Sequence, residues 1–156
     1  MSNPPIYFEQ RLQVGWSDLD ANAHMANTSY LDHADNTRML FFYRNGFTMS
    51  RFASEKFGPV IVRDELAYRK ELRLMEDFRV DLEAAGLSQD GVRWRLRNTF
   101  RNSANEILAV VTSDGLWFDL ERRKPRIPPQ DLHNLMRALQ RTNDFAEIPT
   151  KNPSET

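Results

Sequence analysis

Two carboxylates, a histidine and an asparagine lie close together in the segment GWSDLDANAHMANTSYLDHAD, residues 15–35. Asp18 and Asp20 are two residues apart, His24 and Asn27 follow them, and Tyr30 stands where a helical pattern opens. Side chains of these types can act as a nucleophile or general base, or orient such a group. Core packing gives no reason to gather them between a strand and a helix. The segment is therefore a candidate active site.

Each of these residues also has a purely structural explanation. Asp18 and Asp20 could form turns or cap a helix, because aspartate accepts hydrogen bonds from nearby backbone N–H groups. His24 could polarise a substrate carbonyl, orient Asp20 or cap the helix start. The Asn27 side chain is better suited to a helix cap than to catalysis. We interpret Asp18 as a brace of the loop and keep both explanations open for Asp20.

The composition limits the class of protein. With 156 residues the chain suits one domain. A formal charge of -1 and a pI near 6.3 predict neither nucleic acid nor a membrane as a partner. The N-terminus lacks the features of a signal peptide and no apolar run reaches transmembrane length, so we expect a cytoplasmic protein.

Metal and cofactor chemistry is not indicated. Cysteine is absent, which excludes disulfides, thiolate nucleophiles and cysteine-ligated metals. His24, Asp32 and His33 form a poor metal set, because adjacent residues on a helix point about 100° apart. We therefore expect no metal and no cofactor.

The surrounding elements predict an α+β fold. The segment RLQVGW alternates apolar and polar residues like a half-buried strand. Residues 28–45 follow a helical period, and Asn45-Gly46 supplies a stop signal. Four alternating segments with hairpin-length turns follow, at 59–74, 77–84, 92–100 and 106–120. We expect a curved antiparallel five-stranded sheet wrapped around one long central helix.

The C-terminal part predicts a short helix and a tail. Residues 127–141, IPPQDLHNLMRALQR, open with a proline pair and carry one narrow apolar stripe. Because the stripe is narrow, we expect this helix to pack against the edge or outer face of the sheet. We assign residues 1–142 to a single domain and residues 143–156 to a disordered tail.

The segment VGWSDLDANAHMANTSYLDHADNTR, residues 14–38, resembles the loop and helix start of the 4-hydroxybenzoyl-CoA thioesterase-like acyl-CoA thioesterases. The spacing of Asp20 and Tyr30 matches that family, and His-Met-x-Asn is similar to its GHxNN run. The family's glycine before the histidine is Ala23 here, and the first asparagine is Ala26. The resemblance covers about residues 8–127 and includes the ending WFDLERRKPRIPP.

The resemblance implies a hot-dog fold and an acyl-CoA thioesterase that releases a carboxylic acid and coenzyme A. It implies Asp20 as nucleophile or general base, with His24 in support. The implied oxyanion donor is the backbone N–H of Asn27, aided by that of Ala26, and a helix N-terminus suits this role. It also implies a homodimer or a dimer of dimers, since the family builds its site where subunits meet. The implied substrate-binding residues are Tyr30, Ala26 and Ala34.

Other interpretations stay open. A non-catalytic hot-dog module could bind acyl-thioesters or a protein partner, and a hydratase-type enzyme would need a separate Asp-His pair that the sequence does not show after a strand. The run ERRKPR, residues 121–126, could bind the phosphates of coenzyme A or be a solvated strand exit.

Arginines also recur on one face of the segment around residues 93–101. We interpret them as cross-strand partners of acidic residues on a solvated sheet. The residues concerned are Arg93, Arg95, Arg97 and Arg101, with Glu65, Glu71, Asp81 and Glu83 opposite.

Overall fold

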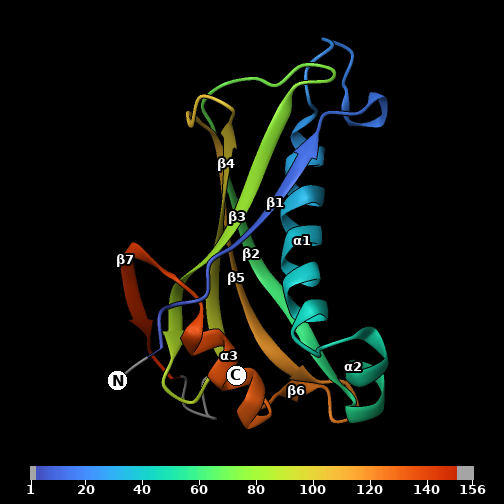
Figure 1. The fold of residues 1–156 in the computed structure, drawn as a ribbon. Coiled ribbons are helices and arrows are strands. Elements are labelled where there is room, and N and C mark those ends of the chain that lie inside the picture. The colour runs from blue at the N-terminus through green and yellow to red at the C-terminus, as the bar shows by residue number, and fades with distance from the viewer. Residues whose placement is uncertain (1–2, 151–156) are drawn as a thin grey trace.

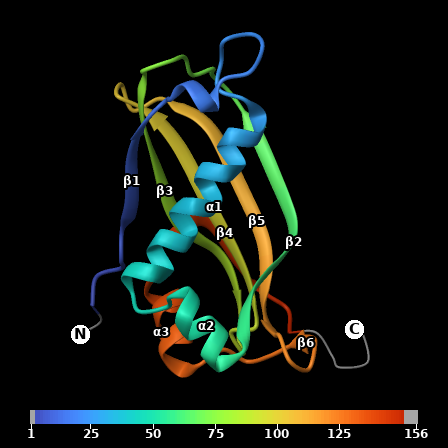
Figure 2. The ribbon, with the colours of Figure 1, turned by 90° about the vertical axis from the view of Figure 1, so that its right-hand side faces the viewer.

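The computed structural model describes residues 3–150. A curved sheet wraps around helix α1 (Asn27–Arg44), which lies against its concave face (Figures 1 and 2). The strands follow the order β1-β3-β4-β5-β2, and each pairing in this series is antiparallel. The predicted α+β architecture is confirmed. The five strands are β1 (Phe8–Gln13), β2 (Phe57–Tyr68), β3 (Asp77–Ser88), β4 (Arg93–Asn102) and β5 (Ile107–Asp119).

Two further strands extend the sheet. Strand β6 (Lys124–Pro125) pairs with β5, and strand β7 (Arg141–Ile148) pairs in parallel with the second half of β3. Strand β1 occupies the same edge of β3 up to Leu82, and β7 takes it over from Ala84 (Figure 1).

The expected disordered tail is therefore wrong for residues 143–148. Strand β7 buries its side chains partly at a spacing of three residues, at Thr142, Phe145 and Ile148, and its pairing is irregular. A two-residue alternation, the usual sequence signal of a strand, is absent for that reason. Residues 151–156 of the expected tail lie outside the described residues.

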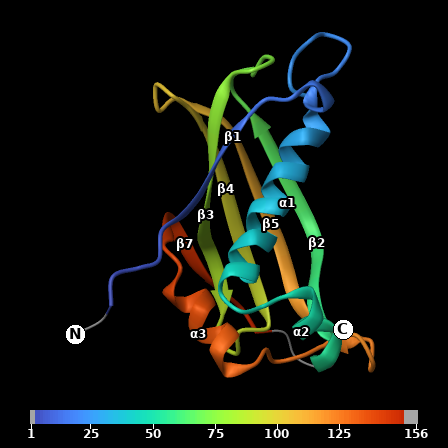
Figure 3. The ribbon, with the colours of Figure 1, turned by 45° about the vertical axis from the view of Figure 1, so that its right-hand side comes forward.

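Helix α3 (Gln130–Ala138) is present as predicted, but it is a core element. Leu132, Met136 and Leu139 are at most 2% exposed and pack in one cluster with Phe41 and Trp94. Helix α3 lies beside the short helix α2 (Met49–Glu55), beyond the C-terminal end of α1 (Figures 2 and 3). A narrow stripe suffices there because α1 leaves that end of the sheet uncovered, and the expected packing on the edge or outer face is wrong.

A second apolar cluster supports the other end of α1. Tyr30 and Ala34 on the first turns of the helix pack with Met25, Leu72 and Phe100. The segments before α1 and between β2 and β3 meet above this cluster (Figure 1). The candidate site residues of the sequence lie in this region. Among residues 3–150, no helix combines the length and the apolar character needed to cross a membrane.

Candidate active site

The loop that carries Asp20 folds back on itself and onto the β2–β3 connection. The Asp20 N–H donates to the His24 carbonyl at 2.9 Å, and the Met25 N–H donates to the Leu72 carbonyl at 2.8 Å. Ala23 completes the turn with φ of 62°, in the left-handed region that favours glycine. Ala23 therefore adopts the left-handed conformation that glycine, the family's residue at this position, adopts without steric cost. The loop is held in one geometry from two sides.

The Asp20 carboxylate stabilises this loop with one of its two oxygens. Its Oδ1 accepts the Asn22 N–H at 2.8 Å and the His24 N–H at 3.3 Å. Among residues 3–150, no group donates to Oδ2, and the side chain is exposed at the wall of a cavity. The structural explanation thus accounts for one oxygen, and the other is available for chemistry.

Asp18 fastens the loop to the first turns of α1. Its Oδ1 lies 2.9 Å from His33 Nε2, and its Oδ2 accepts the Gly15 N–H at 2.8 Å. Its carbonyl accepts the Ala26 N–H at 2.7 Å and the Ser29 hydroxyl at 3.2 Å. These bonds use both carboxylate oxygens, which agrees with the interpretation of Asp18 as a brace.

The start of α1 offers free backbone donors, but the Ala26 N–H is not one of them. Ala26 is the N-cap residue, and its N–H is already bound to Asp18, so the expected help from Ala26 in binding an oxyanion is wrong. The Asn27 N–H has no acceptor within the described part of the chain. Within residues 3–150 the Asn27 side chain accepts no hydrogen bond from a backbone N–H of the helix, so it does not cap the helix either. Asn27 thus contributes its N–H at the positive end of the helix dipole.

A cavity of about 480 Å³ brings four of the predicted residues together. Ala34, expected at the substrate, is instead fully buried in the core below and does not line this cavity. The β2–β3 connection supplies the opposite wall, which the sequence pattern had indicated only as strand. The predicted residues at the cavity are Asp20, His24, Asn27 and Tyr30, and the other lining residues are Met25, Tyr68, Arg69, Lys70 and Glu71.

Glu71 is a functional candidate that the sequence did not reveal. Its Oε2 lies 3.0 Å from His24 Nε2, and its Oε1 accepts a bond from Arg73 at 3.4 Å. The two partners of this pair are far apart in the sequence, and no local pattern links them. Glu71 fixes the orientation of the His24 imidazole beside Asp20.

Tyr30 closes the inner end of the cavity. Its ring packs edge-on against Tyr68 and Phe100, with centroids 5.4 and 5.2 Å away. Burial, with smaller contributions from Tyr68 and Glu71, raises the pKa of Tyr30 to about 12. The hydroxyl therefore keeps its proton at neutral pH and can donate a hydrogen bond, but it cannot act as a base.

The described residues do not form a metal site. No group of three or more histidine, aspartate or glutamate side chains is placed to hold an ion between residues 3 and 150. The set considered from the sequence is dispersed, because His24 pairs with Glu71 and His33 pairs with Asp18.

The sequence also matches a family model, that of the thioesterase-like superfamily, over residues 14–139. The chain belongs to the thioesterase-like superfamily. This assignment confirms the family resemblance of residues 14–38, and the hot-dog fold that it implied is the fold observed. No curated protein matched the sequence.

Solved structures share the fold at low sequence identity. A Staphylococcus aureus protein in complex with CoA has a TM-score of 0.81 and 16% identity, with 92% of each chain covered. A 1,4-dihydroxy-2-naphthoyl-CoA thioesterase from Synechocystis has a TM-score of 0.77 and 15% identity, covering 85% of this chain and 97% of that one. A DHNA-CoA thioesterase from Staphylococcus aureus has a TM-score of 0.74 and 14% identity, covering 83% and 87%.

Proposed function

We propose that the protein hydrolyses an acyl-CoA thioester to a carboxylic acid and coenzyme A. The observation that carries this proposal is that Asp20 and the free N–H of Asn27 line one cavity at the N-terminus of α1. A thioester carbonyl needs a base or nucleophile on its carbon and a donor on its oxygen, and these two groups supply them. Superfamily membership supports the same reaction class.

The chemistry follows from these positions. As general base, Asp20 takes a proton from water while the water oxygen attacks the carbonyl carbon. Negative charge develops on the carbonyl oxygen, which the Asn27 N–H stabilises by about 3 kcal/mol if it acts like other oxyanion donors. The C–S bond then breaks, and the coenzyme A thiolate leaves and takes up a proton. As nucleophile, Asp20 would attack the carbon itself, and the C–S bond would break with release of the coenzyme A thiolate to leave an anhydride. Water would then cleave the anhydride to the carboxylic acid and restore the Asp20 carboxylate.

His24 and Tyr30 have supporting roles in this proposal. Glu71 holds the His24 imidazole at the cavity, where it can donate to the thioester or keep the loop of Asp20 in place. The protonated Tyr30 hydroxyl can donate to a polar atom of the substrate. Tyr30 is accordingly a substrate-binding residue here, and Ala34 lies beneath it in the core.

We further propose that two copies form a homodimer through β2, with a dimer of dimers as the larger form. Strand β2 is the end of the sheet order, and Val62 and Tyr68 on it are 60% and 46% exposed. Unpaired strand edges favour association with another chain. Because Tyr68 lines the cavity, a second copy at β2 would lie beside the substrate site.

A non-catalytic module that binds acyl-thioesters is the second candidate. The observation in its favour is that Asp20 Oδ1 already serves as a loop brace for Asn22 and His24. Release of free thiol from a panel of acyl-CoAs, from aromatic to long-chain, tests the two functions. We expect turnover of at least one acyl-CoA, and binding without turnover across the panel would favour the module.

A further inference from the structure

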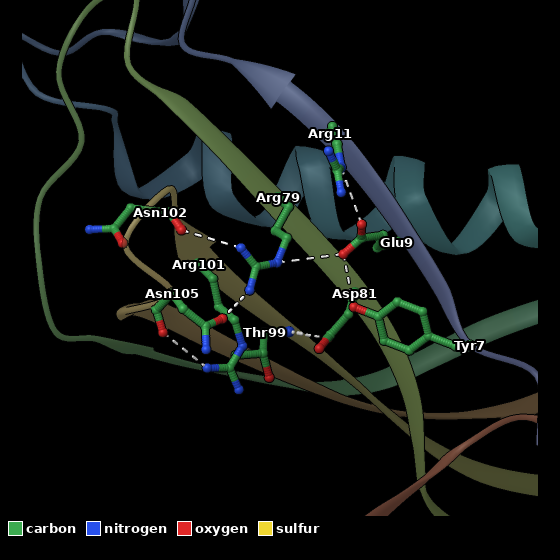
Figure 4. Close-up of polar contacts among 9 residues, drawn as sticks. All are labelled: Tyr7, Glu9, Arg11, Arg79, Asp81, Thr99, Arg101, Asn102 and Asn105. Atoms are coloured by element: carbon green, nitrogen blue, oxygen red, sulfur yellow. Dashed lines mark hydrogen bonds and ion pairs between the residues drawn. The ribbon is translucent and has the colours of Figure 1, made fainter.

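Three arginines lie side by side in one row on the outer face of the sheet, opposite α1 (Figure 4). Arg11 of β1 is directly opposite Arg79 of β3, and Arg79 is directly opposite Arg101 of β4. Like charges directly opposite each other destabilise a sheet. Fold stability therefore gives no reason for this row.

Neighbouring carboxylates neutralise only part of the row. Glu9 accepts a bond from Arg11 at 3.2 Å and lies 3.5 Å from Arg79. No carboxylate among residues 3–150 forms a salt bridge with Arg101, whose bond goes to the Asn105 carbonyl at 3.4 Å. A guanidinium has five N–H donors, so most of those of Arg101 are free. Of the acidic partners expected from the sequence, Asp81 and Glu83 lie near enough to interact electrostatically with Arg101, but neither forms a salt bridge with it.

The arginines line a hollow with other hydrogen-bonding groups. Its volume is about 740 Å³, and Gln13, Asn102 and Ser103 contribute to its walls together with one acidic residue, Asp77. Arg79 is fixed in advance, because it donates to the Asn102 carbonyl at 3.3 Å and to the Asn105 side chain (Figure 4). A donor held in its binding geometry loses little conformational freedom when a ligand binds.

We propose that this hollow binds a small molecule with more than one phosphate group, such as a diphosphate or a nucleotide. Adjacent strands lie roughly 4.8 Å apart, so the row of three guanidinium groups extends over about 10 Å. This length suits a polyphosphate better than a single anion, and arginine matches phosphate oxygens through paired N–H donors. Arg101 and Arg11 supply the free donors, and Arg79 supplies the fixed one.

Two sources share this chemistry, the nucleotide end of an acyl-CoA and a separate phosphorylated ligand. Only the first rests on the proposed function. Calorimetric titration of the full-length protein with inorganic diphosphate, ADP and coenzyme A tests the site without any need for turnover. We expect saturable binding of diphosphate that weakens with added salt, because the contacts are ionic.

Two variants should change the affinity for diphosphate in opposite directions, and a third should leave it unchanged. Arg101→Gln should weaken diphosphate binding by about tenfold or more, as expected for a lost charge-assisted contact. Glu9→Gln should strengthen it several-fold, because it removes the carboxylate that competes for Arg11 and Arg79. A gain of affinity cannot result from damage to the fold. Arg137→Gln on α3 removes the same charge elsewhere and should leave binding unchanged.

The outcomes separate the sources and the hypotheses. If Arg101→Gln weakens coenzyme A and diphosphate alike, the site takes the nucleotide end of the substrate. If only diphosphate weakens, the site takes a separate ligand. No diphosphate binding by the wild type, or equal binding by Arg101→Gln, would overturn the proposal even if thiol release is normal. Diphosphate binding by a protein without turnover would overturn the proposed hydrolysis alone.

Discussion

Asp18 Oδ1 and His33 Nε2 lie 2.9 Å apart and join the loop of the candidate base to the second turn of α1. Both side chains are largely buried, with 15% and 21% exposed. Asp18→Asn keeps the shape but removes the charge from this contact and from the bond to the Gly15 N–H. We expect the free energy of unfolding to fall by about 1–2 kcal/mol, because bonds to charged groups are the stronger ones. Urea unfolding measures this change. The rate of hydrolysis should fall less in Asp18→Asn than in Asp20→Asn.

The left-handed backbone at Ala23 predicts a substitution that raises the free energy of unfolding. Glycine adopts φ of 62° without the steric cost that the alanine side chain imposes. Ala23→Gly should raise the free energy of unfolding by up to about 1 kcal/mol, the net of relieved strain and a more flexible unfolded chain. Ala21→Gly in the same loop is the control, since Ala21 has no positive φ, and it should lower stability or leave it unchanged. A loss of stability in Ala23→Gly would contradict the backbone geometry of the loop.

The assembly can be tested at β2. We expect light scattering in dilute solution to give twice the 18.3 kDa of one chain. Val62→Lys places a charge on the exposed β2 strand and should produce monomers at micromolar concentration. Tyr43→Lys, at an exposed apolar residue of α1, should leave the mass unchanged. A wild-type monomer at these concentrations would contradict the proposed dimer.

The pH dependence of stability should carry the signature of Asp81. Burial raises the pKa of this carboxyl from 3.8 to about 6, although the Thr99 N–H bound at 2.8 Å acts in the opposite direction. Between these values the folded state holds a proton that the unfolded state has lost. The contribution of Asp81 to stability is therefore greatest below pH 4 and falls as the pH rises through about 6.

Asp81→Asn removes the free-energy cost of burying the charged carboxylate at neutral pH. We expect the variant to exceed the wild type by about 2 kcal/mol in free energy of unfolding at pH 7.5, and by much less at pH 4.5. Asp144→Asn is a control of opposite sign, because Arg97 lowers the pKa of Asp144 and the charged form stabilises the fold. Urea unfolding at several pH values checks both variants. A constant difference between Asp81→Asn and the wild type would show that Asp81 titrates normally.

The parts of the fold with regular periodicity could be predicted from the sequence. Residues 28–45 predicted α1 within one residue at each end, because one face of a long helix is buried in a regular period. The alternation of apolar and polar residues in 92–100 predicted β4, because successive side chains of a strand point to opposite faces and one face is buried. Strand β7 could not be predicted, because its partly buried residues do not alternate.

Contacts between distant segments limited the prediction of the site. The loop and helix start are continuous in sequence, and Asp20, His24, Asn27 and Tyr30 were found there. Glu71 reaches His24 only through the folding of the β2–β3 connection. The engagement of the Ala26 N–H by the Asp18 carbonyl is a backbone contact that no residue type reveals.

Asp20→Asn separates the catalytic and structural interpretations of the candidate base. Asparagine can still accept the Asn22 and His24 N–H groups through Oδ1, so the loop should keep its geometry and the melting temperature should stay near that of the wild type. The substitution removes the negative charge and the basicity, and loss of a positioned base costs on the order of a hundredfold or more in rate. We expect near-intact acyl-CoA binding and hydrolysis reduced by at least roughly a hundredfold.

Asp18→Asn is the matched control for this change, because both carboxylates lie in one loop but Asp18 has both oxygens engaged. A catalytic Asp20 predicts that Asp20→Asn loses mainly rate and Asp18→Asn loses mainly stability. Thiol release and thermal melting, measured on both variants, give the two quantities. Full hydrolytic activity in Asp20→Asn would show that the carboxylate only braces its loop, and the free oxygen Oδ2 would then have no role in the reaction.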